Sequence, residues 1–160
     1  MVAHVPFITP DYVDRLKALG GGLSLTSWRY LAGTDLNNGP PFRMILDNGI
    51  HAGMSSDGMQ IAPMNPWLHM YYAVTGVNAL GQLINGSQQI SREEVLRLYT
   101  RDNGWFLREE DQLGSLELGK LGDLVVLNKD YFTVADADLK RDPVDPPPSS
   151  AARSFTMRES

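Results

Sequence analysis

The sequence predicts an α/β fold, and three features indicate it. Apolar or β-branched runs at residues 2–5, 23–26 and 50–55 read as short strands. Helical patterns separate these runs, and glycine or proline marks each change of segment. Strands that alternate with helices pair in parallel through right-handed crossovers. We therefore expect a parallel sheet covered by helices, forming one wall of a larger sheet or barrel.

The elements of the first half follow in order from their residue types. The strand at residues 2–5 leads to a helix at 10–20, in which Pro10 suits the first helical position. The spacing of Val13, Leu16 and Leu19 predicts one apolar stripe on that helix. The strand at 23–26, a loop rich in Gly, Asn and Pro at 33–41, a short helix at 42–47 and the strand at 50–55 follow.

The second half is predicted to be helical before it becomes irregular. Asn65 and Pro66 begin a helix that extends to about residue 78, and Ser91 to Glu94 is a capping box for a helix through about residue 101. Residues 114–127 combine glycine turns with an apolar run at 124–127, which predicts a buried strand. From Ala135 the composition becomes rich in Asp, Pro and Ser, which favours a disordered tail.

Composition narrows the class of protein. The chain has 160 residues, 42% of them hydrophobic, with 19 acidic and 14 basic side chains and a formal charge of -5. No basic stripe is present to neutralise phosphates, so we expect no nucleic-acid partner. Cysteine is absent, which excludes disulfides and thiolate chemistry. The start lacks a signal-peptide pattern and no apolar run approaches about 20 residues, so we expect no membrane partner and a cytoplasmic location.

Two polar residues follow predicted strands. Asp57 comes soon after the strand at 50–55, and His4 lies at the end of the strand at 2–5. The carboxyl ends of parallel strands are where catalytic groups converge, and His with Asp suits a divalent metal. The alternatives are structural: Asp57 can bind backbone amides in a Ser-Asp-Gly turn, and His4 can be an ordinary hydrogen-bonded histidine.

Trp28 and Arg29 form a second candidate site. An arginine between aromatic residues at a strand end can bind a substrate carboxylate, and a structural role is the alternative. His51 begins its strand and so lies at the opposite end from a catalytic edge. His69 belongs to an aromatic-rich helix whose residues favour packing over cofactor binding.

Together these segments resemble the amidohydrolase superfamily, specifically the amidohydrolase family 3 branch of metal-dependent TIM-barrel hydrolases. The resemblance covers about residues 1–134, and Ala3 stands where the family has Glu before the histidine. The matching segments are Ala3-His4 with the end of barrel strand 6, residues 23–29 with strand 7, residues 41–57 with strand 8, residues 73–76 and 91–95 with the following helices, and residues 114–127 with the strand that returns to the small β-sandwich domain.

The resemblance implies a function and a metal. The family hydrolyses carbon-nitrogen bonds other than peptide bonds, so the implied substrate is a small amide or N-acyl compound. His4 matches a metal ligand of the family, and Asp57 matches the aspartate that binds metal and acts as general base. Zinc is the divalent ion expected, and no other cofactor is implied.

The resemblance also implies that this chain supplies only about strands 6–8 of the barrel. The family's His-x-His of strand 1, its carboxylated Lys of strand 4 and its His of strand 5 have no counterpart in these 160 residues. We therefore expect a truncated chain that is inactive alone. The alternative is a noncatalytic remnant that acts as an associating or binding module, with self-association through exposed sheet edges.

The predicted organisation has three parts: residues 1–112 as part of the barrel, 113–134 as the return segment and 135–160 as a disordered tail. Read one nucleotide earlier, with permitted codons, residues 149–159 give Val-Val-Gly-Gly followed by further apolar residues. This string resembles the family's last strand. We therefore expect a frameshift between about residues 129 and 149, which the genomic DNA would reveal.

Overall fold

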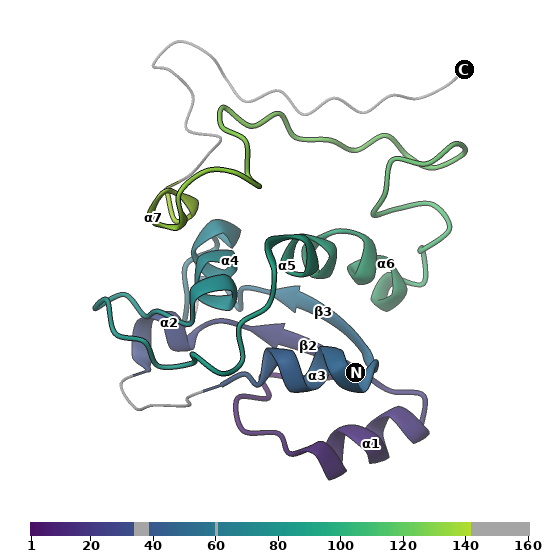
Figure 1. Cartoon of the computed structure of the whole chain (residues 1–160). Helices are drawn as coiled ribbons and strands as arrows, with labels where there is room; N and C mark the ends of the chain where they lie inside the picture. Colours follow the sequence, from purple (N-terminus) through teal and green to yellow (C-terminus); the bar gives the residue numbers. More distant parts are fainter. Residues whose placement is uncertain (34–38, 60, 142–160) are drawn as a thin grey trace.

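Three parallel strands form the centre of the protein (Figure 1). The structure is a computed structural model, and it describes residues 1–33, 39–59 and 61–141. The sheet has the order β1-β2-β3, with all neighbours parallel. The strands are β1 (Val2–Ala3), β2 (Gly22–Thr26) and β3 (His51–Ser55). The predicted α/β class and parallel pairing are therefore confirmed, and the strand of residues 22–26 lies at the centre of the sheet.

Helices lie on both sides of these strands. In the view of Figure 1, α1 and α3 lie below the long strands, and α4, α5 and α6 lie above them. The helices of the described residues are α1 (Pro10–Ala18), α2 (Arg29–Ala32), α3 (Phe42–Asn48), α4 (Pro66–Thr75), α5 (Arg92–Tyr99), α6 (Arg101–Leu107) and α7 (Asp136–Leu139).

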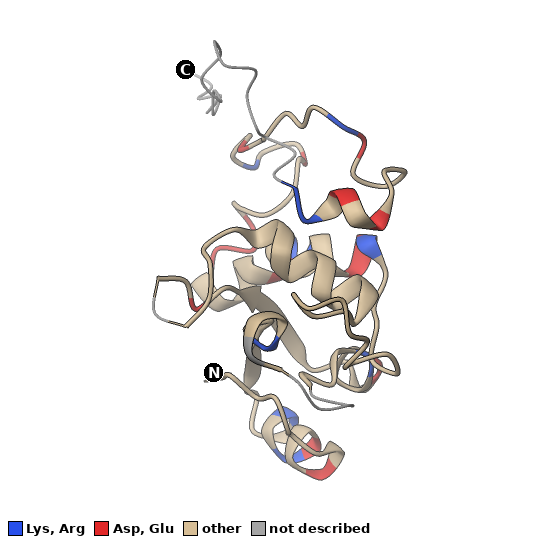
Figure 2. Cartoon of the chain, turned by 90° about the vertical axis from the view of Figure 1, so that its left-hand side faces the viewer, with Lys and Arg blue, Asp and Glu red and all other residues tan. Residues whose placement is uncertain are grey.

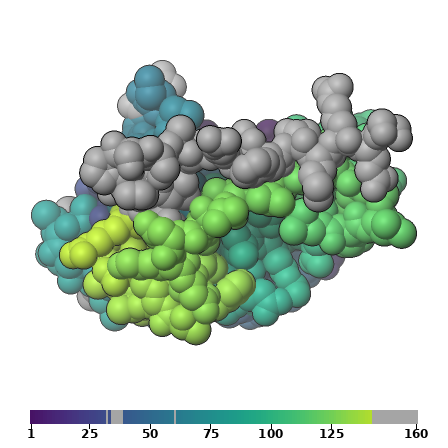
Figure 3. Space-filling view, turned by 90° about the horizontal axis from the view of Figure 1, so that it is seen from above, coloured from purple at the N-terminus to yellow at the C-terminus, as the bar shows by residue number. Residues whose placement is uncertain are grey.

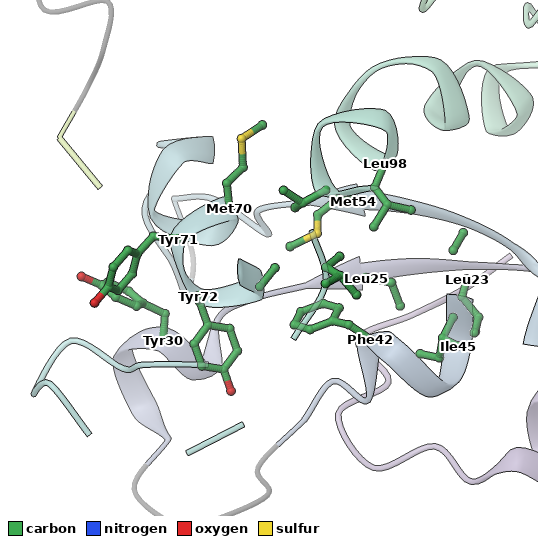
Figure 4. Packing of buried hydrophobic residues seen from close by; sticks show 14 of the residues in the cluster. Leu23, Leu25, Tyr30, Phe42, Ile45, Met54, Met70, Tyr71, Tyr72 and Leu98 are labelled. Carbon is green, nitrogen blue, oxygen red and sulfur yellow. The ribbon is translucent and has the colours of Figure 1, made fainter. Parts of the chain in front are cut away.

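The core lies between one face of the sheet and the helices. Leu23, Leu25 and Met54 alternate with smaller residues along their strands and are almost fully buried, as are Phe42 and Ile45 of α3 (Figure 4). Burial of each such side chain stabilises the fold by about 1.5–3 kcal/mol. This apolar face holds the strands in place and so determines where their carboxyl ends lie.

On the opposite face of the sheet, α6 packs so closely that only glycine fits at two strand positions. A Cβ atom on Gly22 would lie 2.6 Å from Trp105 Cζ3, and one on Gly53 would lie 2.1 Å from Asn103 Oδ1. Asn103 Nδ2 also donates to the Met54 carbonyl at 3.0 Å, on the outer edge of β3. α6 therefore supplies one donor to the backbone of β3, which has no strand neighbour other than β2 in the described sheet.

The first strand and helix are shorter than predicted. β1 ends at Ala3 and not at residue 5, because His4 adopts a left-handed backbone conformation with φ of 55°. α1 begins at Pro10 as expected and buries Val13, but Leu19 lies beyond the helix and is 84% exposed. The apolar stripe on α1 therefore ends before Leu19.

Helix ends in the second half follow local capping. The capping box is confirmed: Ser91 Oγ accepts from Glu94 N at 3.1 Å, and Glu94 Oε2 accepts from Ser91 N at 2.7 Å. α4 ends at Thr75 and not near residue 78, because Gly76 follows with φ of 69° and closes the helix. The sequence did not predict α6.

Residues 124–127 do not form the buried strand that was predicted. Only Leu124 makes a bridge, and the side chains of Val125 and Val126 are 60% and 70% exposed. A strand needs a neighbour for its backbone groups, and no strand of the described residues pairs with this segment beyond that bridge. Seen from above, the described C-terminal residues, green to yellow, spread over one face of the molecule (Figure 3).

The described chain remains ordered beyond Ala135, where disorder was expected. Arg92 donates to the carbonyl of Tyr131 at 2.6 Å and also to that of Val134, while Tyr131 and Leu139 are 5% and 3% exposed. These buried apolar residues fix α7 against α4. The expectation of disorder is therefore wrong for residues 135–141, and the rest of the tail, 142–160, lies outside the described residues.

Acidic and basic residues are interspersed along the described chain, as the red and blue segments of the ribbon show (Figure 2). They form ion pairs such as Arg43 with Glu94, whose Nη1 and Oε1 atoms lie 2.8 Å apart. None of the helices within the described residues is long and apolar enough to cross a membrane.

Candidate functional site

The carboxyl ends of the strands meet at one edge of the sheet, because parallel strands point the same way. β1, β2 and β3 end at Ala3, Thr26 and Ser55. His4 follows β1 directly, and Asp57 follows β3 after one intervening residue. In parallel α/β proteins this edge is where binding and catalytic groups gather.

His4 and Asp57 lie next to each other at this edge. His4 Nδ1 is 3.7 Å from Asp57 Oδ2 and 3.4 Å from Thr26 Oγ1. The His4 backbone N–H donates to the Ser24 carbonyl at 3.3 Å, which ties the residue to β2. The side chains of His4 and Asp57 are 45% and 27% exposed, so both are accessible to solvent. The structure thus brings the two candidate residues together, and their metal and catalytic roles stay predictions.

Both residues occupy unusual backbone conformations. His4 and Asp57 have φ values of 55° and 52°, and Met59 near them has φ of 75°. A left-handed conformation costs a residue with a side chain about 1 kcal/mol or more, and such residues cluster at functional sites. Sequence reasoning missed this feature, although His and Asp are among the residues that adopt it most readily.

The turn that holds Asp57 leaves its carboxylate facing His4. The amide of Gly58 donates to Ser56 Oγ at 3.0 Å, so Ser56 supplies the turn contact that was considered for Asp57. Met59 N donates to the Ala62 carbonyl at 3.1 Å, and Gly58 pairs with Ala62 in a parallel bridge. The loop after β3 therefore closes on itself and presents Asp57 at the edge.

Trp28 and Arg29 lie at the junction of β2 and α2. The Arg29 guanidinium carbon is 4.8 Å from the centre of the Trp28 ring and 5.7 Å from that of the Phe7 ring. Phe7 belongs to the loop after His4, so the cation lies on the same edge as the His4–Asp57 pair. Arg29 Nε is buried without a hydrogen-bond partner within the described part of the chain. A substrate role for these two residues stays a prediction.

The other histidines lie elsewhere, as expected. His51 begins β3, at the opposite end of the sheet, and stacks on Trp105 with ring centres 4.1 Å apart. His69 of α4 is 1% exposed, and its Nε2 is 2.9 Å from the Pro63 carbonyl oxygen. Burial lowers the pKa of His69, and the hydrogen bond to Pro63 partly opposes that change.

The described residues supply few metal donors. They contain no group of three or more His, Cys, Asp or Glu side chains placed to hold one ion. His4 Nδ1 and Asp57 Oδ2 are two suitable donors, whereas a catalytic zinc uses three protein ligands. The residues present therefore fit only part of a catalytic zinc site.

Two cavities lie away from this edge. One of about 590 Å³ is lined by His51 and Trp105 near the amino end of β3. The other, of about 620 Å³, lies between α6 and the segment that includes Leu116 and Val125. Neither cavity is lined by His4 or Asp57.

The family of the chain is established by comparison with known proteins. A model of the amidohydrolase family matches residues 1–145, which is most of the chain. The protein therefore belongs to the amidohydrolase family, within the amidohydrolase superfamily, and the resemblance found in its sequence is confirmed.

Curated relatives agree with this assignment. The chain is 27% identical over 95 residues to imidazolonepropionase from Bdellovibrio bacteriovorus, which covers 59% of this chain and 20% of the relative. It is 28% identical over 100 residues to N-substituted formamide deformylase from Arthrobacter pascens, which covers 62% of this chain and 18% of the relative. The matched region thus spans about a fifth of each relative.

Solved structures share the fold. An uncharacterized metal-dependent hydrolase from Pyrococcus furiosus superimposes with a TM-score of 0.56 and 24% identity over 74% of this chain and 25% of its own. A zinc-bound adenosine deaminase from Xanthomonas campestris superimposes with a TM-score of 0.61 and 16% identity, over 88% of this chain and 32% of its own. E. coli guanine deaminase superimposes with a TM-score of 0.59 and 20% identity, over 78% of this chain and 27% of its own.

Proposed function

We propose that this chain is the C-terminal part of a TIM-barrel amidohydrolase, spanning about strands 6–8, and that His4 and Asp57 are metal ligands of its active site. The observation that carries the proposal is the 3.7 Å approach of His4 Nδ1 and Asp57 Oδ2 at the carboxyl edge of parallel strands. Membership of the amidohydrolase family supports the same assignment.

Asp57 is the proposed general base. Its carboxylate is partly exposed and close to an imidazole, so it can accept a proton from a water molecule at this edge. A divalent metal such as zinc, when bound, supplies Lewis-acid polarisation and makes water more acidic. His4 and Asp57 provide two of the protein ligands that such an ion needs, so we propose that the 160-residue chain is inactive alone.

The proposed substrate is a small amide or N-acyl compound, hydrolysed at a carbon-nitrogen bond other than a peptide bond. One relative is named for action on N-substituted formamides, which supports this class. Arg29, whose guanidinium lies over the Trp28 ring and over the Phe7 ring, is the proposed contact for a substrate carboxylate. A cytoplasmic location is part of the proposal.

A noncatalytic module is the second candidate. The observation that favours it is that the described residues form a hydrophobic core around three strands. Asn103 covers part of the β3 edge, and Arg92 fastens residues 131–136 onto α5. Such a unit could persist as a binding or associating domain.

Metal binding and turnover by the purified chain test these proposals. We expect weak binding of Zn²⁺ or Mn²⁺ in calorimetric titrations, further weakened by Asp57→Asn, and no hydrolysis of N-formyl or N-acyl amino acids. Asp123→Asn is the matched control, because Asp123 is exposed and far along the chain from the pair. Turnover by the wild-type chain that Asp57→Asn abolishes would contradict the expected inactivity. Equal metal affinity in the wild type, Asp57→Asn and Asp123→Asn would show that Asp57 is not a metal ligand.

A further inference from the structure

His69 is a buried titratable residue with one clear contact. Its Nε2 lies 2.9 Å from the Pro63 carbonyl oxygen, and a carbonyl can only accept, so Nε2 carries the proton. Nδ1 is buried without a hydrogen-bond partner within the described residues. The side chain therefore donates its one ring N–H to the loop between β3 and α4.

That loop has little apolar packing of its own. The side chains of Met59, Ile61 and Met64 are 88%, 50% and 66% exposed. Ala62 is the one buried apolar residue among those described in this loop, at 9% exposed, so polar contacts contribute much of what determines the loop conformation. Asn65 caps α4 by accepting from Trp67 N at 2.9 Å, but this contact fixes the helix start and not the part of the loop that bears Asp57.

A continuous set of contacts leads from His69 to Asp57. His69 holds Pro63, and the adjacent Ala62 accepts from Met59 N at 3.1 Å and pairs with Gly58. Gly58 follows Asp57 directly, and its backbone approaches Met64 so closely that a Cβ atom would lie 2.4 Å from Met64 Cγ. A shift of Pro63 would therefore be passed to the residue beside Asp57.

We propose that His69 is a positioning residue for Asp57: by holding the Pro63 carbonyl, it keeps the β3–α4 loop in the conformation that places the carboxylate beside His4. The importance of this role for catalysis rests on the proposed function of Asp57. The geometric part, that His69 holds the loop, stands on the contacts alone.

The matched pair His69→Gln and His69→Asn tests the geometric part. Gln places an amide donor near the position of Nε2, whereas Asn is one methylene shorter and does not reach Pro63. Hydrogen exchange at the Met59 amide is the readout, because its bond to Ala62 belongs to the loop. We expect exchange about tenfold faster, or more, in His69→Asn and near wild-type exchange in His69→Gln.

Two controls separate positioning from general destabilisation. Amides of Ile84 and Ile90, which donate to Gly76 and Ala73, should keep their exchange rates in His69→Asn. Ser91→Ala loses a capping contact far from the loop. In this variant, the exchange rate of the Met59 amide relative to that of the Ile90 amide should stay unchanged from the wild type. Equal loss in the Gln and Asn variants, or loss spread over all these amides, would overturn the proposal.

A measurement on the wild-type chain covers the case in which His69→Asn does not fold. Nitrogen chemical shifts of the His69 ring should show a protonated Nε2 and an unprotonated Nδ1 at neutral pH, and the opposite tautomer would overturn the proposal. Mn²⁺ titration then tests the link to function: affinity should fall in His69→Asn and recover in His69→Gln. Absence of Mn²⁺ binding in the wild type would contradict the proposed metal function and leave the exchange result to decide the role of His69.

Discussion

At the scale of single residues, the candidate site combines accessible polar groups with backbone strain. His4 and Asp57 are partly exposed and lie 3.7 Å apart, and both have positive φ values. Neither conformation is needed to form the sheet, because β1 and β3 end before these residues. The strain therefore lies in the residues that follow the strands and not in the strands themselves.

The strain at Asp57 predicts a gain in stability when the residue is changed to glycine. Glycine adopts φ of 52° without a clash, so Asp57→Gly should raise the free energy of unfolding by about 0.5–1 kcal/mol. Asp57→Ala also removes the carboxylate but keeps the clash, so it should not raise that energy. Urea denaturation measures both. A lower stability for Asp57→Gly than for Asp57→Ala would show that the backbone at this position is not strained.

Burial of His69 predicts a pH dependence of stability. Its pKa is lowered in the folded chain, chiefly by burial, while the unfolded value is about 6.5. Between these two pKa values the unfolded chain binds more protons than the folded chain. The contribution of neutral His69 to the free energy of unfolding is therefore complete above about pH 6.5 and is lost as the pH falls toward the folded pKa. The urea midpoint should fall more between pH 7.5 and 5 in the wild type than in His69→Gln. Parallel profiles would contradict a lowered pKa.

At the scale of helices and strands, contacts distant in sequence determine which segments become ordered. α6 packs on the glycines of β2 and β3, and its Asn103 binds the Met54 carbonyl. Arg92 at the start of α5 binds residues 131 to 136 and so orders the segment that leads into α7. By contrast, residues 124–127 have the apolar character of a strand but lack a neighbour, and they stay exposed.

The clamp made by Arg92 predicts a local loss of order in Arg92→Met. The Arg92 side chain is 17% exposed and donates to Tyr131 and Asp136, both at 2.6 Å. Its removal leaves carbonyls unpaired and should cost about 1–3 kcal/mol. We expect faster hydrogen exchange and faster proteolysis in residues 131–139. Arg97→Met is the control on the same helix, since its exposed pair with Glu93 should contribute at most about 1 kcal/mol. Equal behaviour of the two variants would rule out the clamp.

At the scale of the whole molecule, the described residues form a core but leave apolar side chains uncovered. Val2 of β1 is 44% exposed, and Leu118, Val125 and Val126 lie on the segment between α6 and α7 with exposures of 104%, 60% and 70%. β1 pairs only with β2 in the described sheet, so its other edge has no strand neighbour there. Uncovered strand edges and apolar side chains favour association.

We therefore expect the purified chain to self-associate at micromolar concentration, as measured by light scattering. The double variant Leu118→Glu and Val126→Glu should reduce association by removing apolar contacts from the segment between α6 and α7. The double variant of Tyr12→Glu on α1 and Leu19→Glu just after it adds the same charge at exposed positions elsewhere, and it should leave association near the wild-type level. A monodisperse wild-type monomer with one thermal transition would contradict this expectation and favour the noncatalytic module.

The sequence alone determined the three strands and the helices at α1, α3, α4 and α5, the parallel sheet, the capping box at Ser91 and the candidate pair His4 and Asp57, because periodicity, capping and strand ends are local patterns. Only the tertiary structure decided the left-handed turns at the pair and the contact of His69 with Pro63. It also decided the order of α7, which depends on Arg92 and Tyr131, 39 residues apart. Such contacts form between side chains that no local pattern relates, so their partners appear only when the chain is folded.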